Sequence, residues 1–326
     1  MKNTEVNQTH DKKSYRVILI LLIGLAAFSS TIKELNQLRA SVSEVAQFIG
    51  EWGATVIPTA NARTITKVEH CSADVAAQNA RSDEFRWSGR IAPGAAVEIK
   101  GINGDITAEP ATDGEVQVVA VKSSRRGDLN SVELKVVEHG GGVTICAIYP
   151  NDDSTNPNTC EPGASGERRN SSATGNGRNN DVRVDFTVRV PPRVGFVGRT
   201  INGEIGAASL ASNIVSRTVN GSIRISTSGY AEATTLNGGI SARLGDANWP
   251  EALTFKTLNG EITLDLPSNT STEVKAETLN GTINSDFPLS LKSLTSRRRL
   301  IGRIGPGGRE LVLKTLNGSI NLRRAS

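Results

Sequence analysis

Few side chains in this sequence could do chemistry, and their spacing excludes most kinds of catalytic site. Only three histidines and three cysteines occur in 326 residues, which is too few to make a histidine metal site or a catalytic triad a reasonable prediction. The run His139-Gly140-Gly141-Gly142 matches the oxyanion loop of some esterases, but that chemistry also needs a G-x-S-x-G elbow, which the sequence lacks. We interpret this run as a glycine turn between two strands, and we predict no catalytic residue, metal or cofactor.

The cysteines predict one disulfide. Cys146 ends an expected strand and Cys160 follows 14 residues later, a spacing that indicates a disulfide if the chain is exported. Cys71 is then left over. Because His70-Cys71 has no companions at metal-ligand spacing, we interpret Cys71 as an unpaired or intermolecular thiol.

The strands that would position these residues are predicted by one repeated motif, T-[ILV]-N-G-x-I. It recurs at a period near 20 residues, which is typical of stacked repeats that bury their apolar faces against one another. A degenerate copy without the Asn is predicted over residues 299–304. The repeat residues are the pairs Asn103-Gly104, Asn202-Gly203, Asn220-Gly221, Asn237-Gly238, Asn259-Gly260, Asn280-Gly281 and Asn317-Gly318.

Acidic residues at a shared repeat position could cleave polysaccharides if two of them stood about 5 to 9 Å apart. Counting from the motif Asn as zero, position +2 carries Asp105, Glu204 and Glu261. In sequence order the neighbours of Glu261 at this position are Gly239 and Thr282, so we predict no carboxylate pair there. No Asp-rich calcium loop occurs in the sequence.

Two strands are expected to flank each Asn-Gly corner. Positions −6, −4, +3 and +5 are mostly apolar, yet −1 is always Ile, Val or Leu, so we expect the inward phase to slip between −4 and −1. Asn-Gly suits a corner because both residues tolerate a positive φ.

Two all-β folds could contain such corners. An antiparallel meander would leave every −1 residue on the wrong face, whereas a β-solenoid could turn it inward at the corner. We therefore predict an all-β fold, a β-solenoid of stacked coils of about 20 residues, with a meander as the alternative. Like positions of consecutive repeats should then lie about 5 Å apart, against about 10 Å in a meander.

The motif copies resemble the bacterial "putative adhesin" family of β-strand-repeat proteins, in which T-[ILV]-N-G-x-I repeats follow an N-terminal export segment. The resemblance covers residues 85–326. It implies the repeat fold and an adhesive surface role, and it transfers no catalytic residue to this sequence.

The N-terminal region predicts export. Residues 1–14 are polar and form a short cytoplasmic N-terminus, and basic residues precede an apolar run from Val17 to Phe28. This pattern predicts a signal anchor or signal peptide over residues 15–32, with the uncleaved transmembrane anchor favoured. Because basic residues before an apolar run stay inside, we expect a single-pass protein of the bacterial membrane whose β-region is exported to the periplasm or cell surface.

Four further segments complete the expected organisation. Residues 33–84 are interpreted as an amphipathic helical stalk and linker, which could stand alone or join copies of the chain into a homo-oligomer. We then predict an antiparallel β cap over residues 85–150, with a hairpin turn at Asp113-Gly114, a flexible loop over 151–180 and the solenoid over 181–326. The stalk's apolar positions are Leu35, Leu38, Val42, Val45, Ile49 and Trp52.

Composition narrows the function. The net charge is only +4, aromatic residues are 4%, and none is interleaved with the C-terminal arginines, so nucleic acid is not a predicted partner. We predict a non-enzymatic, membrane-anchored protein that acts as an adhesin or envelope scaffold, with an envelope glycan or protein as its ligand. The alternatives are a polysaccharide-active β-helix enzyme and an envelope-stress sensor that signals through a membrane partner.

Overall fold

The computed structural model describes residues 81–150, 158–163, 180–296 and 298–325. The chain divides into two units, Met1–Asn61 and Ala62–Ser326, and all described residues belong to the second. The predicted anchor over 15–32 lies outside the described residues, as does the predicted stalk and linker apart from residues 81–84, which are not helical but begin a strand over Arg81–Gly89. Within the described ranges, no helix is long and apolar enough to cross a bilayer.

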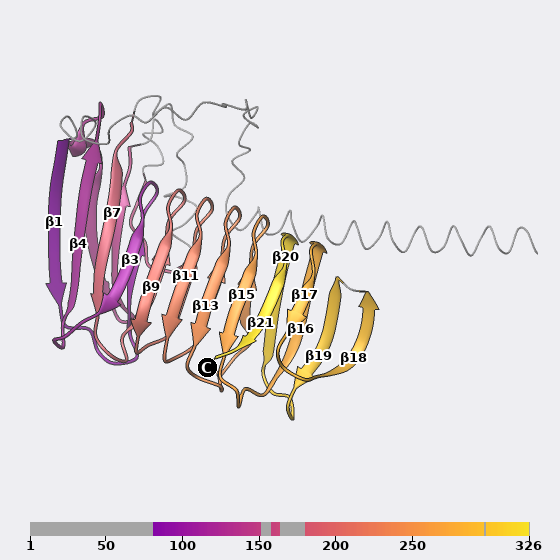
Figure 1. The fold of residues 1–326 in the computed structure, drawn as a ribbon. Helices are drawn as coiled ribbons and strands as arrows, with labels where there is room; N and C mark the ends of the chain where they lie inside the picture. The colour runs from indigo at the N-terminus through magenta and orange to yellow at the C-terminus, as the bar shows by residue number, and fades with distance from the viewer. Residues whose placement is uncertain (1–80, 151–157, 164–179, 297, 326) are drawn as a thin grey trace, which may run out of the picture. The chain divides into compact units, whose positions relative to one another are not determined.

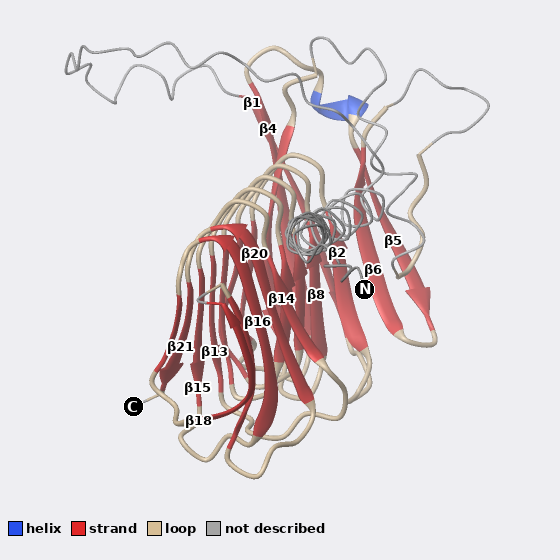
Figure 2. Cartoon of the chain, turned by 90° about the vertical axis from the view of Figure 1, so that its right-hand side faces the viewer, coloured by secondary structure: helices blue, strands red, loops and turns tan. Residues whose placement is uncertain are grey.

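The described chain forms two β-sheets of ten and eleven strands (Figure 1, Figure 2). In spatial order, sheet A contains β1 (Arg81–Gly89), β4 (Val116–Ser124), β7 (Arg183–Val190), β3 (Ile106–Pro110), β9 (Ile205–Leu210), β11 (Ile223–Thr227), β13 (Ile240–Leu244), β15 (Ile262–Leu266), β21 (Ile320–Arg324) and β17 (Ile283–Ser285). Sheet B contains β18 (Leu289–Ser296), β19 (Arg299–Ile304), β16 (Thr272–Asn280), β20 (Glu310–Asn317), β14 (Leu253–Lys256), β12 (Ala231–Thr234), β10 (Ile214–Arg217), β8 (Gly195–Arg199), β2 (Ala96–Lys100), β6 (Gly142–Ile148) and β5 (Glu133–His139). One short 3-10 helix, η2 (Leu129–Ser131), follows β4.

Each repeat is one coil that adds a strand to each sheet. Strand β10 pairs in parallel with β8 and β12 in sheet B, and β11 pairs in parallel with β9 and β13 in sheet A. Parallel pairing in register places each motif beside its counterpart, as a solenoid requires and a meander forbids. The all-β solenoid prediction is therefore confirmed.

The coils do not stack in sequence order at the C-terminal end. The last motif, residues 315–320, lies between the motifs at 257–262 and 278–283, because β20 pairs with both β14 and β16. The predicted degenerate copy at 299–304 is wrong: it forms β19, which pairs antiparallel with β16 and β18. Residues 299–304 lack the Asn-Gly corner, so this strand folds back along sheet B rather than crossing to sheet A.

The N-terminal part is not the separate antiparallel cap predicted over residues 85–150. Strands β2, β3 and β6 belong to the parallel array, and the antiparallel pairs of this part are β1 with β4, β4 with β7, and β5 with β6. Strand β7 lies between β3 and β4, so Asp113-Gly114 does not join a hairpin. The glycine turn after His139 does connect the antiparallel strands β5 and β6, as predicted.

The core lies between the two sheets. The +3 isoleucines from Ile106 to Ile320 are at most 2% exposed in six of the seven coils, and sheet B contributes Phe196 and Phe255, each 0% exposed. Burying one such side chain stabilises the fold by about 1.5 to 3 kcal/mol. Each coil therefore depends on its neighbours for most of its stability.

The predicted disulfide Cys146–Cys160 is present. It fastens residues 158–163, which we call the strap, to strand β6 of sheet B. Asn158 Nδ2 also donates to Tyr149 O at 2.9 Å. The rest of the loop predicted over 151–180, apart from Asn180, lies outside the described residues.

Replacing both cysteines with serine should lower the free energy of unfolding by about 3 kcal/mol, because the bridge closes a short loop in the unfolded chain. Urea unfolding of the wild type and of Cys146→Ser/Cys160→Ser, each with and without a dithiol reductant, measures this. The reductant should destabilise only the wild type. An equal response of both proteins would contradict a role for this bridge.

Asp181 holds the turn after β4. Its carboxylate accepts hydrogen bonds from Ser124 Oγ and from the backbone N–H groups of Arg125, Arg126 and Gly127. The bond from Ser124 contributes most, and together these bonds lower the pKa of Asp181 to about 2. A carboxylate with several donors is favoured in its ionised form.

Asp181 should add an acid-sensitive component to stability. Its folded pKa lies below the unfolded value of 3.8, so its contribution is present above that value and is lost as the pH falls toward 2. Between pH 6 and pH 2, the free energy of unfolding should fall less steeply with decreasing pH for Asp181→Asn than for the wild type. Asp113→Asn, at an exposed aspartate, serves as the matched control. An equal loss of unfolding free energy at acid pH in the wild type and in Asp181→Asn would refute the assignment.

Candidate binding surface

The motif asparagines form a continuous ladder of amides along one corner of the array. Each Asn Nδ2 donates to the Asn Oδ1 of the preceding coil, at 2.7 to 2.9 Å, from Asn103 to the last coil. Backbone bridges join most of the same residues. In spatial order the ladder contains Asn103, Asn202, Asn220, Asn237, Asn259, Asn317 and Asn280.

The motif glycines are required by close approach of the coils. A Cβ placed on Gly203, Gly221 or Gly260 would lie 1.9 to 2.0 Å from the carbonyl oxygen of the glycine in the preceding coil. Such an approach is closer than any side chain allows. None of the motif asparagines has a positive φ, so the expected reason for Asn-Gly is wrong for the asparagines. Asn supplies the ladder bond, and Gly supplies the space.

In every motif but the first, the threonine two residues before the Asn points into the core, where its hydroxyl donates to the glycine carbonyl of the preceding coil. For Thr218, Thr235 and Thr257 these bonds are 2.8 to 2.9 Å, and the side chains are at most 4% exposed. The inward phase thus runs unbroken through −6, −4 and −2. The phase slip expected between −4 and −1 does not occur.

The apolar −1 residues consequently face outward. Val219, Leu236, Leu258 and Leu316 are partly exposed, and Leu279 in the last coil is 39% exposed. Only Ile102, in the first motif, is buried. The expectation that the solenoid turns this residue inward is wrong, because the buried threonine already occupies the inward position before the corner.

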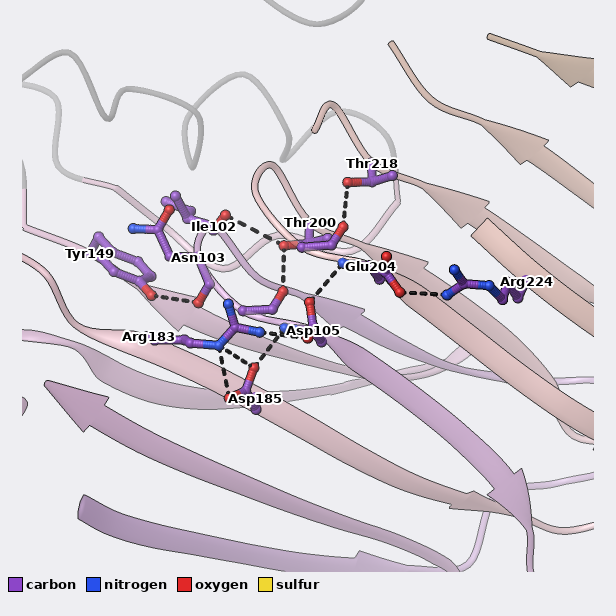
Figure 3. A network of polar contacts seen from close by, with 12 residues as sticks. Ile102, Asn103, Asp105, Tyr149, Arg183, Asp185, Thr200, Glu204, Thr218 and Arg224 are labelled. Carbon is purple, nitrogen blue, oxygen red and sulfur yellow. Dashed lines mark hydrogen bonds and ion pairs between the residues drawn. The ribbon is translucent and has the colours of Figure 1, made fainter. Parts of the chain in front are cut away.

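The structure brings together carboxylates that sequence order kept apart. Asp185, Asp105 and Glu204 occupy position +2 of three adjacent coils (Figure 3). Strand spacing of about 4.8 Å would suit a pair of glycosidase carboxylates. The in-register neighbours of Glu261 are Gly239 and Ser319, not Thr282 as predicted.

The contacts of these carboxylates are structural. Asp105 N donates to Asp185 Oδ1 and Glu204 N donates to Asp105 Oδ1, each at 2.7 Å. Arg183 contacts both aspartates, and Arg224 Nη1 lies 2.5 Å from Glu204 Oε2. The row therefore satisfies backbone donors at the start of the array.

Tyr149 closes the first rung of the ladder (Figure 3). Its hydroxyl lies 3.2 Å from Asn103 O and 3.1 Å from Val182 O, within hydrogen-bonding distance of both carbonyls. Burial raises the pKa of Tyr149 above its usual range. The coil formed by β6 and β7 has no Asn-Gly corner, and the tyrosine fills that position.

A cluster of buried charges lies beneath the strap on the outer face of sheet B. Glu98, Lys100 and Arg199 are 6%, 3% and 9% exposed. Arg199 Nε donates to Glu98 Oε1 at 2.9 Å, while the other carboxylate oxygen accepts from Thr144 Oγ1 and Gly163 N. Burial lowers the pKa of both Lys100 and Arg199, and Glu98 opposes this shift.

Lys100 joins this cluster to the strap. Its ammonium donates to the carbonyl oxygens of Glu161 and Gly163, at 2.6 and 2.5 Å. This cluster was not predicted from the sequence. The available signal was the basic residue that recurs three positions before the motif Asn, as in Lys100, Arg199 and Arg217.

The arrangement presents repeated rows of side chains along its corner and its outer faces. The predicted repeat residues are brought into one ladder, and Cys146 and Cys160 are brought into the strap attachment. Among the described residues, no group of three His, Cys, Asp or Glu side chains could hold a metal ion. Cys71 lies outside the described residues.

Comparison with known proteins supports the motif-based resemblance. A family model described as Toastrack DUF4097, a β-repeat family, matches residues 66–323. The chain is similar to a structure described as a "putative cell adhesion protein" from Clostridium sporogenes, with 13% identity and a TM-score of 0.41, covering 74% of this chain and 100% of that chain. It is also similar to a "putative adhesin" structure from Bacteroides fragilis, with 10% identity and a TM-score of 0.33, covering 74% and 97% of the two chains. No curated protein sequence matches the chain. Because the family model matches most of its length, the chain belongs to the Toastrack DUF4097 family.

Proposed function

We propose that this protein is a non-enzymatic binding or scaffolding protein of the cell envelope, held by residues 15–32 in the membrane with its β-array exported. The observation that carries the proposal is the array itself, in which in-register coils present the same side-chain positions over two wide sheets. Repeat proteins of this kind use such extended surfaces for binding. The disulfide Cys146–Cys160 suits an oxidising compartment outside the cytoplasm.

Two measurements test this function. The intact mass of the exported protein shows whether Met1 and the anchor are retained, and protease added outside intact cells or spheroplasts shows whether the array is accessible there. Binding of the full-length protein to cell-wall fragments, to extracellular matrix proteins and to itself tests the surface role. Binding to none of these partners would oppose the adhesive function.

The stacked carboxylates motivate one second candidate, a polysaccharide-active enzyme. Incubation with acidic and neutral polysaccharides would then release new reducing ends, and Asp105→Asn or Glu204→Gln would abolish that release. We expect no release, because the contacts of Asp105 and Glu204 tie them to the backbone of neighbouring coils.

A further inference from the structure

A row of mainly basic side chains crosses the outer face of sheet B three positions before the motif Asn. We call it the basic row. Since positions −4 and −2 face the core, position −3 faces outward. Figure 2 shows the strands that carry it side by side. In register from strand to strand, the row contains Lys100, Arg199, Arg217, Thr234, Lys256, Lys314, Glu277 and Arg299.

Like charges are direct neighbours at three places in this row. Lys100 is in register with Arg199, Arg199 with Arg217, and Lys256 with Lys314. Neighbouring strands are about 4.8 Å apart, and like charges directly opposite each other destabilise a sheet. Consistently, the charge of Arg217 adds to burial in lowering the pKa of Arg199. The face therefore contains repulsion that a bound polyanion would relieve.

The strap divides the basic row into two parts. Glu98 neutralises Arg199 and lies 3.8 Å from Lys100, which is covered by the strap. Arg217, Lys256 and Lys314 are partly exposed and Arg299 is exposed. Acids also lie along this second part, namely Glu232, whose pKa is raised by burial and by the charge of Glu251, and Glu277, in register with Lys314. The accessible part remains net positive.

Apolar side chains flank the basic row along one side and at some positions on the other. At position −1 lie residues such as Leu236 and Leu258, and position −5 carries Val215 and Val312 with Glu232 and Thr254 between them, all partly exposed. The outer face of sheet A differs, because its positions +4 and +6 carry small polar residues and charges of both signs. Of the two outer faces, only that of sheet B therefore combines a single file of cations with an apolar margin.

We propose that the basic row binds a linear acidic polysaccharide, which lies across the strands with its carboxylates on Arg217, Lys256 and Lys314 and its pyranose C–H faces on the flanking valines and leucines. This rests on the proposed envelope-binding function and names its ligand class. A single file of charges matches a single chain, whereas a membrane surface would contact cations spread in two dimensions. Electrostatic complementarity of this kind selects the partner and makes binding sensitive to salt.

The test measures binding of the full-length protein, in a neutral detergent, to polygalacturonate at low and at physiological salt. The variant Lys256→Gln/Lys314→Gln should bind about tenfold more weakly and should lose part of the salt dependence. The control Arg243→Gln/Arg323→Gln removes the same charge from the outer face of sheet A and should change affinity less than about twofold. Melting temperatures of both variants check that the fold is retained.

Three results would overturn the inference. They are absence of binding by the wild type, equal weakening by both double variants, and binding to phosphatidylglycerol vesicles without binding to polygalacturonate. If the wild type does not bind polygalacturonate but still binds cell-wall fragments, only the proposed ligand class and its binding site are wrong. If it binds neither, the proposed function fails as well.

Discussion

Gly221→Ala should destabilise the protein by at least about 3 kcal/mol. The new Cβ would lie 1.9 Å from Gly203 O and 2.5 Å from Gly203 C, both of them backbone atoms that cannot move aside alone. Relief requires separating two coils, which weakens the Asn202–Asn220 amide bond and the bond from Thr218 to Gly203 O. Overpacking costs about 1 to 3 kcal/mol, and each lost hydrogen bond costs about 1 kcal/mol more. Urea unfolding measures the difference.

Gly206→Ala, in strand β9 of the preceding coil, is the matched control. A Cβ at Gly206 meets no atom within 4 Å, and neither glycine has a φ in the left-handed region. The two substitutions therefore differ only in the room available to the new Cβ. We expect the control to remain within about 1 kcal/mol of the wild type. A Gly221→Ala variant as stable as the control would show that the coils are not so closely stacked at the corner.

Glu98→Ala should cost about 3 to 5 kcal/mol. The substitution leaves Arg199, 9% exposed, and Lys100, 3% exposed, without their buried counter-charge, and removing one partner of a buried ion pair is strongly destabilising. It also removes the acceptor of Thr144 Oγ1 and Gly163 N, so the strap should become more accessible to proteases. The measurements are the free energy of unfolding and the rate of cleavage within residues 158–163.

Glu204→Ala is the corresponding change at an exposed ion pair. The side chains of Glu204 and Arg224 are 51% and 67% exposed, and such pairs contribute about 1 kcal/mol or less. The strap should be unaffected. Equal destabilisation by the two substitutions would contradict the buried electrostatic role of Glu98.

The local sequence was sufficient to predict the coil. A motif repeated at a nearly constant period supplies identical inward and outward positions, and like side chains such as Asn237 and Asn259 then fit best against one another. The same pattern predicts an inward side chain at position −1, and there the prediction is wrong. Thr235 and its counterparts fill the inward position instead, since their hydroxyls find buried carbonyl partners.

The order of the coils could not be read from the sequence. Parallel pairing requires that the motifs of neighbouring coils lie in the same register, but it does not require that these motifs follow one another in the chain. Asn317 can therefore stack between Asn259 and Asn280 as well as a consecutive repeat could. For the same reason Asp105 lies beside Asp185, a residue outside any motif copy. The buried cluster of Glu98, Lys100 and Arg199 depends on this spatial order and on the strap.

The sequence alone determined the all-β repeat fold, the Asn-Gly corners, the disulfide and the family resemblance, because each depends on residues close together or periodic in the chain. Tertiary structure alone decided which coils are neighbours, which charges meet across the sheets and which face carries the basic row. Those features arise from contacts between segments as distant as Glu98 and Arg199, and neither spacing nor composition specifies such contacts.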